Sequence, residues 1–182
     1  MKITLASASP RRIELIGKLP WLDVVVKPSG ADESTDKKDP KEAVVEIAKR
    51  KAFAVEADGL VLGADTMVAI GSRRLGKPHT PDEAREMFAL LCGRTHSVLT
   101  GVCLRRGEKY ETACEETLVE FGEYDAKIVE NYIASGKPFD KAGGYGLQDE
   151  ELAPMIKGII GDYDNVLGLP VRLVGTLAEN FT

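Results

Sequence analysis

The segment Leu60-Val61-Leu62-Gly63-Ala64-Asp65-Thr66-Met67-Val68-Ala69-Ile70 is apolar apart from one glycine, one aspartate and one threonine. A nearly continuous apolar run of this length is typical of a strand that is buried on both faces. Strands of that kind occur mainly in sheets that helices cover on both sides. We therefore predict a central strand over residues 60–70, with helices packed around it.

Strand-like and helix-like segments alternate on both sides of this run. The other expected strands are short runs of β-branched residues at 3–6, 23–27, 96–105 and 110–121, the last two forming an antiparallel hairpin around Gly107. The expected helices begin at a proline or keep a period of 3.6, and they cover 10–17, 40–57, 81–93, 124–135 and 170–181. This alternation of expected strands and helices along the chain predicts an α/β fold. No proline- or serine-rich linker divides the chain, so we expect a single domain over residues 1–182.

Composition excludes several classes of protein. The formal net charge of -5 and the pI near 5.2 argue against a general nucleic-acid-binding surface, which normally carries a basic stripe. No apolar segment is long enough to span a membrane, and the N-terminus lacks the pattern of a secretory leader. Three cysteines without a CxxC pair predict free thiols rather than a disulfide framework. We expect a cytoplasmic protein that binds neither nucleic acid nor membrane.

The first segment with chemical meaning is Leu5-Ala6-Ser7-Ala8-Ser9-Pro10-Arg11-Arg12. It places two arginines in the first turn of a helix that starts directly after a strand. The positive end of the helix dipole disfavours cations there unless an anion binds. A phosphate would satisfy both arginines, with Ser7 donating a hydroxyl hydrogen bond. The alternative is an ordinary turn with two solvated arginines.

Two charged residues interrupt apolar patterns. Lys51 lies on the apolar stripe of its expected helix, so it either snorkels to solvent or faces a buried anion. Asp65 interrupts the central strand, and burying an unpaired carboxylate costs several kcal/mol. Asp65 should therefore lie beside a cation, a metal or several donors, unless a turn splits the strand there.

Further polar residues stand near turns and glycines. Asp32, Glu33 and Asp36 follow the second expected strand, where carboxylates could hold a hard divalent ion. Lys77 follows a turn after the central strand. The glycine-rich stretch 142–148 permits close backbone approach to a ligand and ends in Gln148, whose amide could read a base edge. Each of these features also has a plain interpretation as an exposed loop. The Walker and dinucleotide glycine patterns are absent.

Segments 5–12, 63–66, 76–78, 93–101 and 140–148, with the ending 161–170, together resemble the Maf nucleotide pyrophosphatases. The resemblance covers essentially the whole chain in the family's order and spacing. It implies a mixed, twisted central sheet flanked by helices, with two lobes and a deep cleft, related to the inosine triphosphate pyrophosphatases. It also implies metal-dependent hydrolysis of nucleoside triphosphates to the monophosphate and pyrophosphate.

By position, the resemblance implies that Asp65 is the catalytic base and that Glu33 and Asp65 hold a divalent cation, Mg²⁺ or Mn²⁺. The implied substrate-binding residues are Ser7, Arg11, Arg12, Lys51, Thr66, Lys77 and Gln148. Arg12, Thr66 and Gln148 together are similar to the branch that acts on dTTP and UTP, and modified pyrimidine nucleotides are further candidates. One departure follows Gln148: residues 149–151 read Asp-Glu-Glu where the family usually has glycine and small residues.

Two other functions stay open from the sequence. One is a nucleotide-binding regulator of cell division and septum formation that does not hydrolyse its ligand, and the other is a purine-directed house-cleaning pyrophosphatase. The presence of Asp65 with Glu33 and Lys77 favours catalysis, because a pure binder needs cations for phosphates but no base. The expected partner is the nucleoside triphosphate substrate, and a homodimer is compatible with the sequence.

Overall fold

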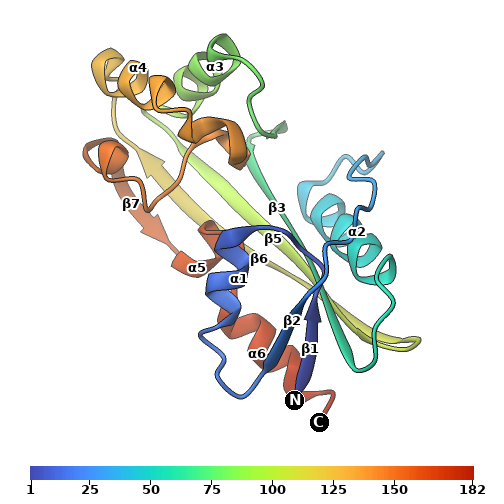
Figure 1. Cartoon of the computed structure of the whole chain (residues 1–182). Helices are drawn as coiled ribbons and strands as arrows, with labels where there is room; N and C mark the ends of the chain where they lie inside the picture. Colours follow the sequence, from blue (N-terminus) through green and yellow to red (C-terminus); the bar gives the residue numbers. More distant parts are fainter. The chain divides into compact units, whose positions relative to one another are not determined.

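The computed structural model describes residues 1–182 and contains one seven-stranded sheet (Figure 1). Its strands are β1 (Lys2–Leu5), β2 (Asp23–Val26), β3 (Leu60–Ile70), β4 (Arg73–Leu75), β5 (Thr95–Arg106), β6 (Lys109–Phe121) and β7 (Ile156–Ile160). The strand order is β2-β1-β3-β5-β6-β7, and β4 pairs with β3. β1 runs parallel to β2 and β3, whereas β4 is antiparallel to β3 and β7 is antiparallel to β6. The sheet is therefore mixed.

Helices connect and flank these strands. They are α1 (Pro10–Ile16), α2 (Pro40–Phe53), α3 (Pro81–Leu91), α4 (Ala126–Ala134), α5 (Tyr163–Val166) and α6 (Val171–Glu179), with 3₁₀ turns η1 (Lys137–Asp140), η2 (Ala142–Gly144) and η3 (Glu150–Met155). The predicted mixed α/β class is confirmed. No helix is long and apolar enough to cross a bilayer.

The chain divides into two compact units. The first unit contains residues 1–66, 99–115 and 168–182, and the second contains residues 67–98 and 116–167. That both units form one domain over residues 1–182 stays a prediction.

In the first unit, α2 packs with its backbone directly on the sheet. A Cβ added to Gly63 of β3 would lie 2.1 Å from the carbonyl oxygen of Ala48, and one added to Gly101 of β5 would lie 2.3 Å from that of Val44. Small buried residues surround this contact, among them Ala6, Ala48, Ala52, Val61 and Cys103. Glycine and alanine at these positions therefore let the helix approach the strands more closely than larger side chains would permit.

The second unit has an aromatic core. Phe88 of α3, Phe121 of β6 and Tyr132 of α4 are all fully buried, and the rings of Phe88 and Tyr132 meet edge to face at 5.9 Å. The sequence Thr80-Pro81-Asp82-Glu83 has the pattern of a capping box, and the Thr80 hydroxyl accepts a hydrogen bond from the Glu83 amide at 3.2 Å, as that pattern predicts. The Glu83 carboxylate instead accepts from the amide of His79, one residue earlier than in a standard capping box.

Several local predictions are wrong in detail. The helix expected over residues 40–57 ends at Phe53, because the buried guanidinium of Arg105 binds the carbonyl oxygens of Ala52 and Val55 at 2.8 and 2.6 Å and satisfies the end of the helix. Ser9, a residue type that often caps helices, precedes α1 but makes no side-chain cap. The strands β4 and β7 were not predicted from the sequence.

Candidate active site

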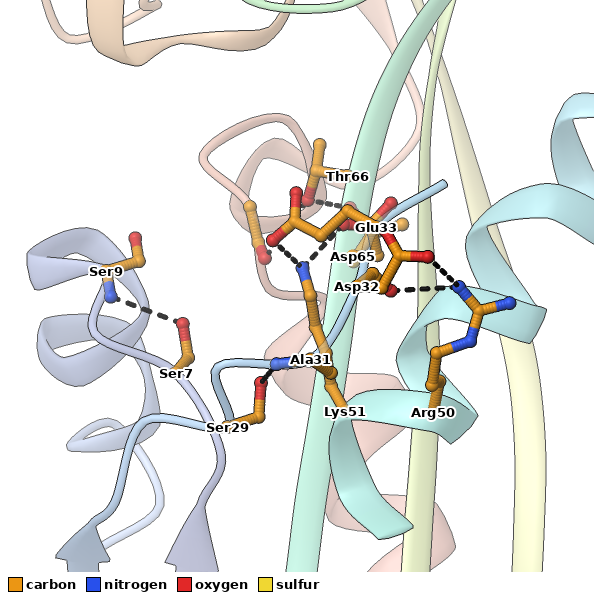
Figure 2. Close-up of polar contacts among 12 residues, drawn as sticks. Ser7, Ser9, Ser29, Ala31, Asp32, Glu33, Arg50, Lys51, Asp65 and Thr66 are labelled. Atoms are coloured by element: carbon orange, nitrogen blue, oxygen red, sulfur yellow. Dashed lines mark hydrogen bonds and ion pairs between the residues drawn. The ribbon is translucent and has the colours of Figure 1, made fainter. Parts of the chain in front are cut away.

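Three charged side chains meet in the first unit (Figure 2). The Lys51 ammonium donates a hydrogen bond to Asp65 Oδ1 at 2.8 Å and lies 2.8 Å from Glu33 Oε1. The side chains of Lys51 and Asp65 are only 8% and 10% exposed, whereas that of Glu33 is 62% exposed. Lys51 therefore faces a buried carboxylate instead of snorkelling to solvent, and the expected cation beside Asp65 is present.

The local sequence explains why this pair forms. Gly63 and Asp65 are two residues apart in β3, so both point to the same face of the sheet. Gly63 faces Ala48 and Ala52 of α2, which places Asp65 opposite the same helix. Lys51 follows Ile47 by four residues on the buried stripe of α2. The close packing at Gly63 thus brings a buried lysine and a buried aspartate together.

Arg12 is held by oxygen atoms of the first unit. Its guanidinium donates to the Gly168 carbonyl at 2.8 Å, to Thr66 Oγ1 at 3.0 Å and to Ser7 Oγ at 3.4 Å. Burial lowers the pKa of Arg12 from its usual value, and the nearby charges of Asp65 and Glu33 oppose that shift. Arg12 is consequently a half-buried cation with fixed orientation, not a solvated one.

Thr100 and Arg11 also lie close to the group formed by Arg12, Thr66 and Ser7. The Thr66 hydroxyl also lies 2.9 Å from the Thr100 hydroxyl on β5. Arg11 is half-buried on α1, and its charge contributes to the lowered pKa of Arg12. Ser7, Arg12 and Thr66 were predicted from the sequence, whereas Thr100 and Gly168, which lie far from them along the chain, were not.

The remaining predicted site residues belong to the second unit. Lys77 follows β4 and is exposed, and Gln148 is exposed at the end of the glycine-rich stretch. The Gly143 amide donates to the Gly76 carbonyl at 2.9 Å, so the chain segments that carry Gln148 and Lys77 are in direct contact. Gly143 has a φ of 69°, a conformation that favours glycine.

A buried histidine that the sequence analysis did not single out supports this stretch. His96 Nε2 lies 2.6 Å from the Tyr145 hydroxyl, and its Nδ1 atom has no hydrogen-bond partner. Burial lowers the pKa of His96 to about 4 and raises the pKa of Tyr145. Both side chains are therefore neutral at pH 7 and anchor the glycine-rich stretch in the aromatic core.

The unusual residues after Gln148 are anchored as well. Asp149 Oδ2 accepts a hydrogen bond from the buried Tyr132 hydroxyl at 2.6 Å and lies 3.7 Å from the Lys141 ammonium. Glu151 pairs with Lys137 at 2.5 Å. Two of the three acidic residues in the departure thus have specific partners within the second unit.

The two predicted metal ligands, Glu33 and Asp65, lie close together. Glu33 and Asp65 converge on one cation, the Lys51 ammonium, and both supply the carboxylate oxygens that Mg²⁺ and Mn²⁺ prefer. No group of three or more His, Cys, Asp or Glu side chains gathers as a metal site. Asp32 and Asp36 do not join the pair. The residues present therefore fit a divalent ion held by two carboxylates, which leaves positions for substrate oxygens and water.

Comparison with known proteins gives matches over nearly the whole chain. A family model described as Maf-like protein matches residues 2–181. The chain is 46% identical to the dTTP/UTP pyrophosphatase of Moorella thermoacetica, with 99% of this chain and 95% of that protein covered. It is 44% identical to the dTTP/UTP pyrophosphatase of Thermosipho africanus (96% and 90% covered) and 42% identical to that of Pyrococcus furiosus (98% and 94% covered).

A solved structure has a similar fold. The Staphylococcus aureus Ham1 protein superposes with a TM-score of 0.57 over the full length of both chains, at 13% sequence identity. Identity this low is informative about the fold alone.

Proposed function

This chain belongs to the Maf-like family, and on that premise we propose that it hydrolyses nucleoside triphosphates, dTTP and UTP foremost, to the nucleoside monophosphate and pyrophosphate. Relatives at 42–46% identity carry the name dTTP/UTP pyrophosphatase. The structural observation that carries the proposal is the buried Asp65 carboxylate, ion-paired with Lys51 beside the exposed Glu33. A protein that only binds nucleotides has no need for a buried carboxylate oriented in this way.

In the proposed mechanism, Asp65 orients a water molecule and accepts its proton as the water attacks the α-phosphorus. A new bond forms between the water oxygen and the α-phosphorus, and the bridging bond to the β-phosphate breaks. Pyrophosphate leaves with the electron pair of that bond. The hydrogen bond from Lys51 at 2.8 Å restricts how the Asp65 carboxylate can turn, which is what a positioned base requires.

The cations have a separate role in this proposal. Arg12, Arg11 and Lys51, which all lie in the first unit, neutralise charge on the substrate phosphates. Lys77 is a further candidate for this role because of the resemblance in sequence. Charge neutralisation is usually the largest contribution in phosphoryl transfer. Arg12 suits this role because its contacts with Ser7, Thr66 and Gly168 fix its orientation before substrate binds.

A divalent ion, Mg²⁺ or Mn²⁺, is part of the proposal, with Glu33 and Asp65 as its protein ligands. When bound, it would supply further neutralisation of the triphosphate and of the leaving pyrophosphate. The Lys51 ammonium, 2.8 Å from Asp65 Oδ1, orients the carboxylate that would bind the ion.

Base selection is assigned to Thr66 and Gln148. The Thr66 hydroxyl is held by Arg12 and Thr100, so its position is set within the first unit. Gln148 offers both an amide donor and a carbonyl acceptor, which suits the edge of a pyrimidine base.

The proposed function is tested by incubating the purified chain with all eight common nucleoside and deoxynucleoside triphosphates, each with Mg²⁺ or Mn²⁺. The products are separated, so that monophosphate with pyrophosphate is distinguished from diphosphate with phosphate. In ¹⁸O-labelled water, attack at the α-phosphorus places the label in the monophosphate. We expect dTTP and UTP to be the best substrates. Nucleotide binding without turnover of any triphosphate would contradict the proposal and favour a regulatory binder.

A further inference from the structure

Arg50 binds the backbone on both sides of Glu33. Its guanidinium NH1 group donates to the carbonyl oxygen of Asp32 at 2.9 Å and to that of Ser34 at 2.6 Å. Figure 2 shows Arg50 on α2 directed at this segment, while Lys51, the next residue of the same helix, reaches the Glu33 carboxylate. Consecutive residues of one helix therefore hold Glu33, one by its backbone and the other by its side chain.

The segment that carries Glu33 needs such a support. Residues 27–39 lie between β2 and α2 and form no helix or strand. The ends of this segment are held by backbone hydrogen bonds, from the Lys27 amide to the Leu5 carbonyl of β1 and from the Ala43 amide of α2 to the Asp39 carbonyl. No backbone-to-backbone hydrogen bond holds residues 28–38 between them, and the Glu33 side chain is 62% exposed. An exposed glutamate on irregular backbone has many rotamers, and restricting it costs free energy each time it must act as a ligand.

Arg50 is also the centre of a small network on α2. Its guanidinium lies 3.7 Å from the Glu46 carboxylate one turn earlier and 3.8 Å from that of Asp32. Glu46 in turn accepts a hydrogen bond from the Thr35 hydroxyl, and Asp32 accepts from the Ser34 amide at 3.0 Å. These contacts converge on the residues that flank Glu33.

We propose that Arg50 is a positioning residue that sets the affinity of the Glu33–Asp65 pair for its divalent ion. The inference rests on the proposed function, in which Glu33 is a metal ligand. By holding the carbonyl groups before and after Glu33, Arg50 restricts the segment to conformations in which the carboxylate stays beside Asp65. Arg50 itself touches neither substrate nor the reacting atoms, so its loss affects metal binding more than the chemical step.

The test measures Mn²⁺ binding without nucleotide, by the electron paramagnetic resonance signal of free Mn²⁺. Arg50→Ala should raise the Mn²⁺ dissociation constant about 10-fold or more, as is usual when a group that supports a metal ligand is removed. At saturating Mn²⁺ its kcat should stay within about twofold of wild type, because ground-state binding and not the transition state is affected. The matched control is Arg172→Ala on α6, which removes the same charge from an exposed position of the same unit.

Hydrogen exchange separates positioning from a general loss of structure. In Arg50→Ala, exchange should rise at the amides of Ala31, Ser34 and Lys37, which donate to side-chain oxygens of the same segment, and should stay at the control level elsewhere. A dissociation constant equal to that of the control, or faster exchange throughout the chain, would overturn the inference while leaving the proposed hydrolysis standing. A wild-type chain that hydrolyses dTTP but binds no Mn²⁺ would overturn it as well. Absence of hydrolysis by the wild-type chain would instead refute the proposed function.

Discussion

Replacing Gly63 with alanine would place a methyl group where α2 packs on β3. The added Cβ would lie 2.1 Å from the Ala48 carbonyl oxygen, 2.6 Å from the Ala52 amide nitrogen and 3.0 Å from the Ala52 Cβ. The two closest atoms are backbone atoms, so no flexible side chain can move aside. The helix and the strand must therefore separate by about 1 Å to bring the closest contact to the ordinary lower limit.

Two consequences follow from this separation. Overpacking a core costs typically 1–3 kcal/mol, and a backbone clash belongs at the upper end, so we expect a loss of about 3 kcal/mol of unfolding free energy. For a chain of this size that loss lowers Tm by roughly 6–12 °C. Because Lys51 is on α2 and Asp65 on β3, their 2.8 Å contact lengthens too, and turnover should fall about 100-fold, as displacements near 1 Å can cause.

The assay combines thermal unfolding with pyrophosphate release from dTTP. The control is Gly158→Ala on β7, where the nearest atom to an added Cβ is Glu120 Oε2 at 3.9 Å. This control should change the unfolding free energy by less than about 1 kcal/mol and leave turnover near wild type. A Gly63→Ala protein that melts within about 2 °C of wild type and keeps its turnover would refute the packing argument.

Three further predictions concern buried polar groups. Lys51→Met leaves the Asp65 carboxylate buried without the Lys51 ammonium, so urea unfolding should show that the unfolding free energy falls by about 3 kcal/mol or more. A fall below about 1 kcal/mol would show that the ion pair does not stabilise the fold. Tyr132→Phe removes the hydrogen bond to Asp149 and should cost about 2 kcal/mol in the same assay, whereas an unchanged midpoint would show that this bond contributes nothing. Burial lowers the pKa of His96 to about 4, so the unfolded chain, with its usual value near 6.5, takes up the proton first as pH falls. The stability that neutral His96 contributes is therefore fully present above about pH 6.5, and up to about 3 kcal/mol of unfolding free energy is lost by about pH 4. If NMR showed the His96 ring titrating near pH 6.5 in the folded protein, this prediction would be contradicted.

Much of the fold could be predicted from the sequence where the signal is local. The apolar run at residues 60–70 has the same limits as β3, and Pro81 marks the start of α3. The end of α2 could not be predicted, because Arg105, far away along the chain, binds the carbonyl of Ala52 in the last turn and that of Val55 just after the helix. β7 was missed because it is a short strand containing Gly158, and its pairing with β6 is a long-range contact.

In the candidate site, too, residues with a local sequence signal could be predicted and long-range contacts could not. Lys51 and Asp65 could be singled out because a charge inside an apolar pattern needs a partner, and the two are indeed paired. The contacts of Gly168 with Arg12 and of Thr100 with Thr66 could not be foreseen, since only the folded chain brings these residues together. The roles of Lys77 and Gln148 toward substrate stay predictions.

The most direct test of the central claim is the rate of pyrophosphate release from dTTP by Asp65→Asn, compared with wild type at saturating Mg²⁺ and substrate. Circular dichroism establishes that the variant is folded. If Asp65 is the general base, turnover should fall by roughly 100-fold or more. A folded Asp65→Asn protein that releases pyrophosphate at a rate close to wild type would contradict the account and remove Asp65 from the mechanism.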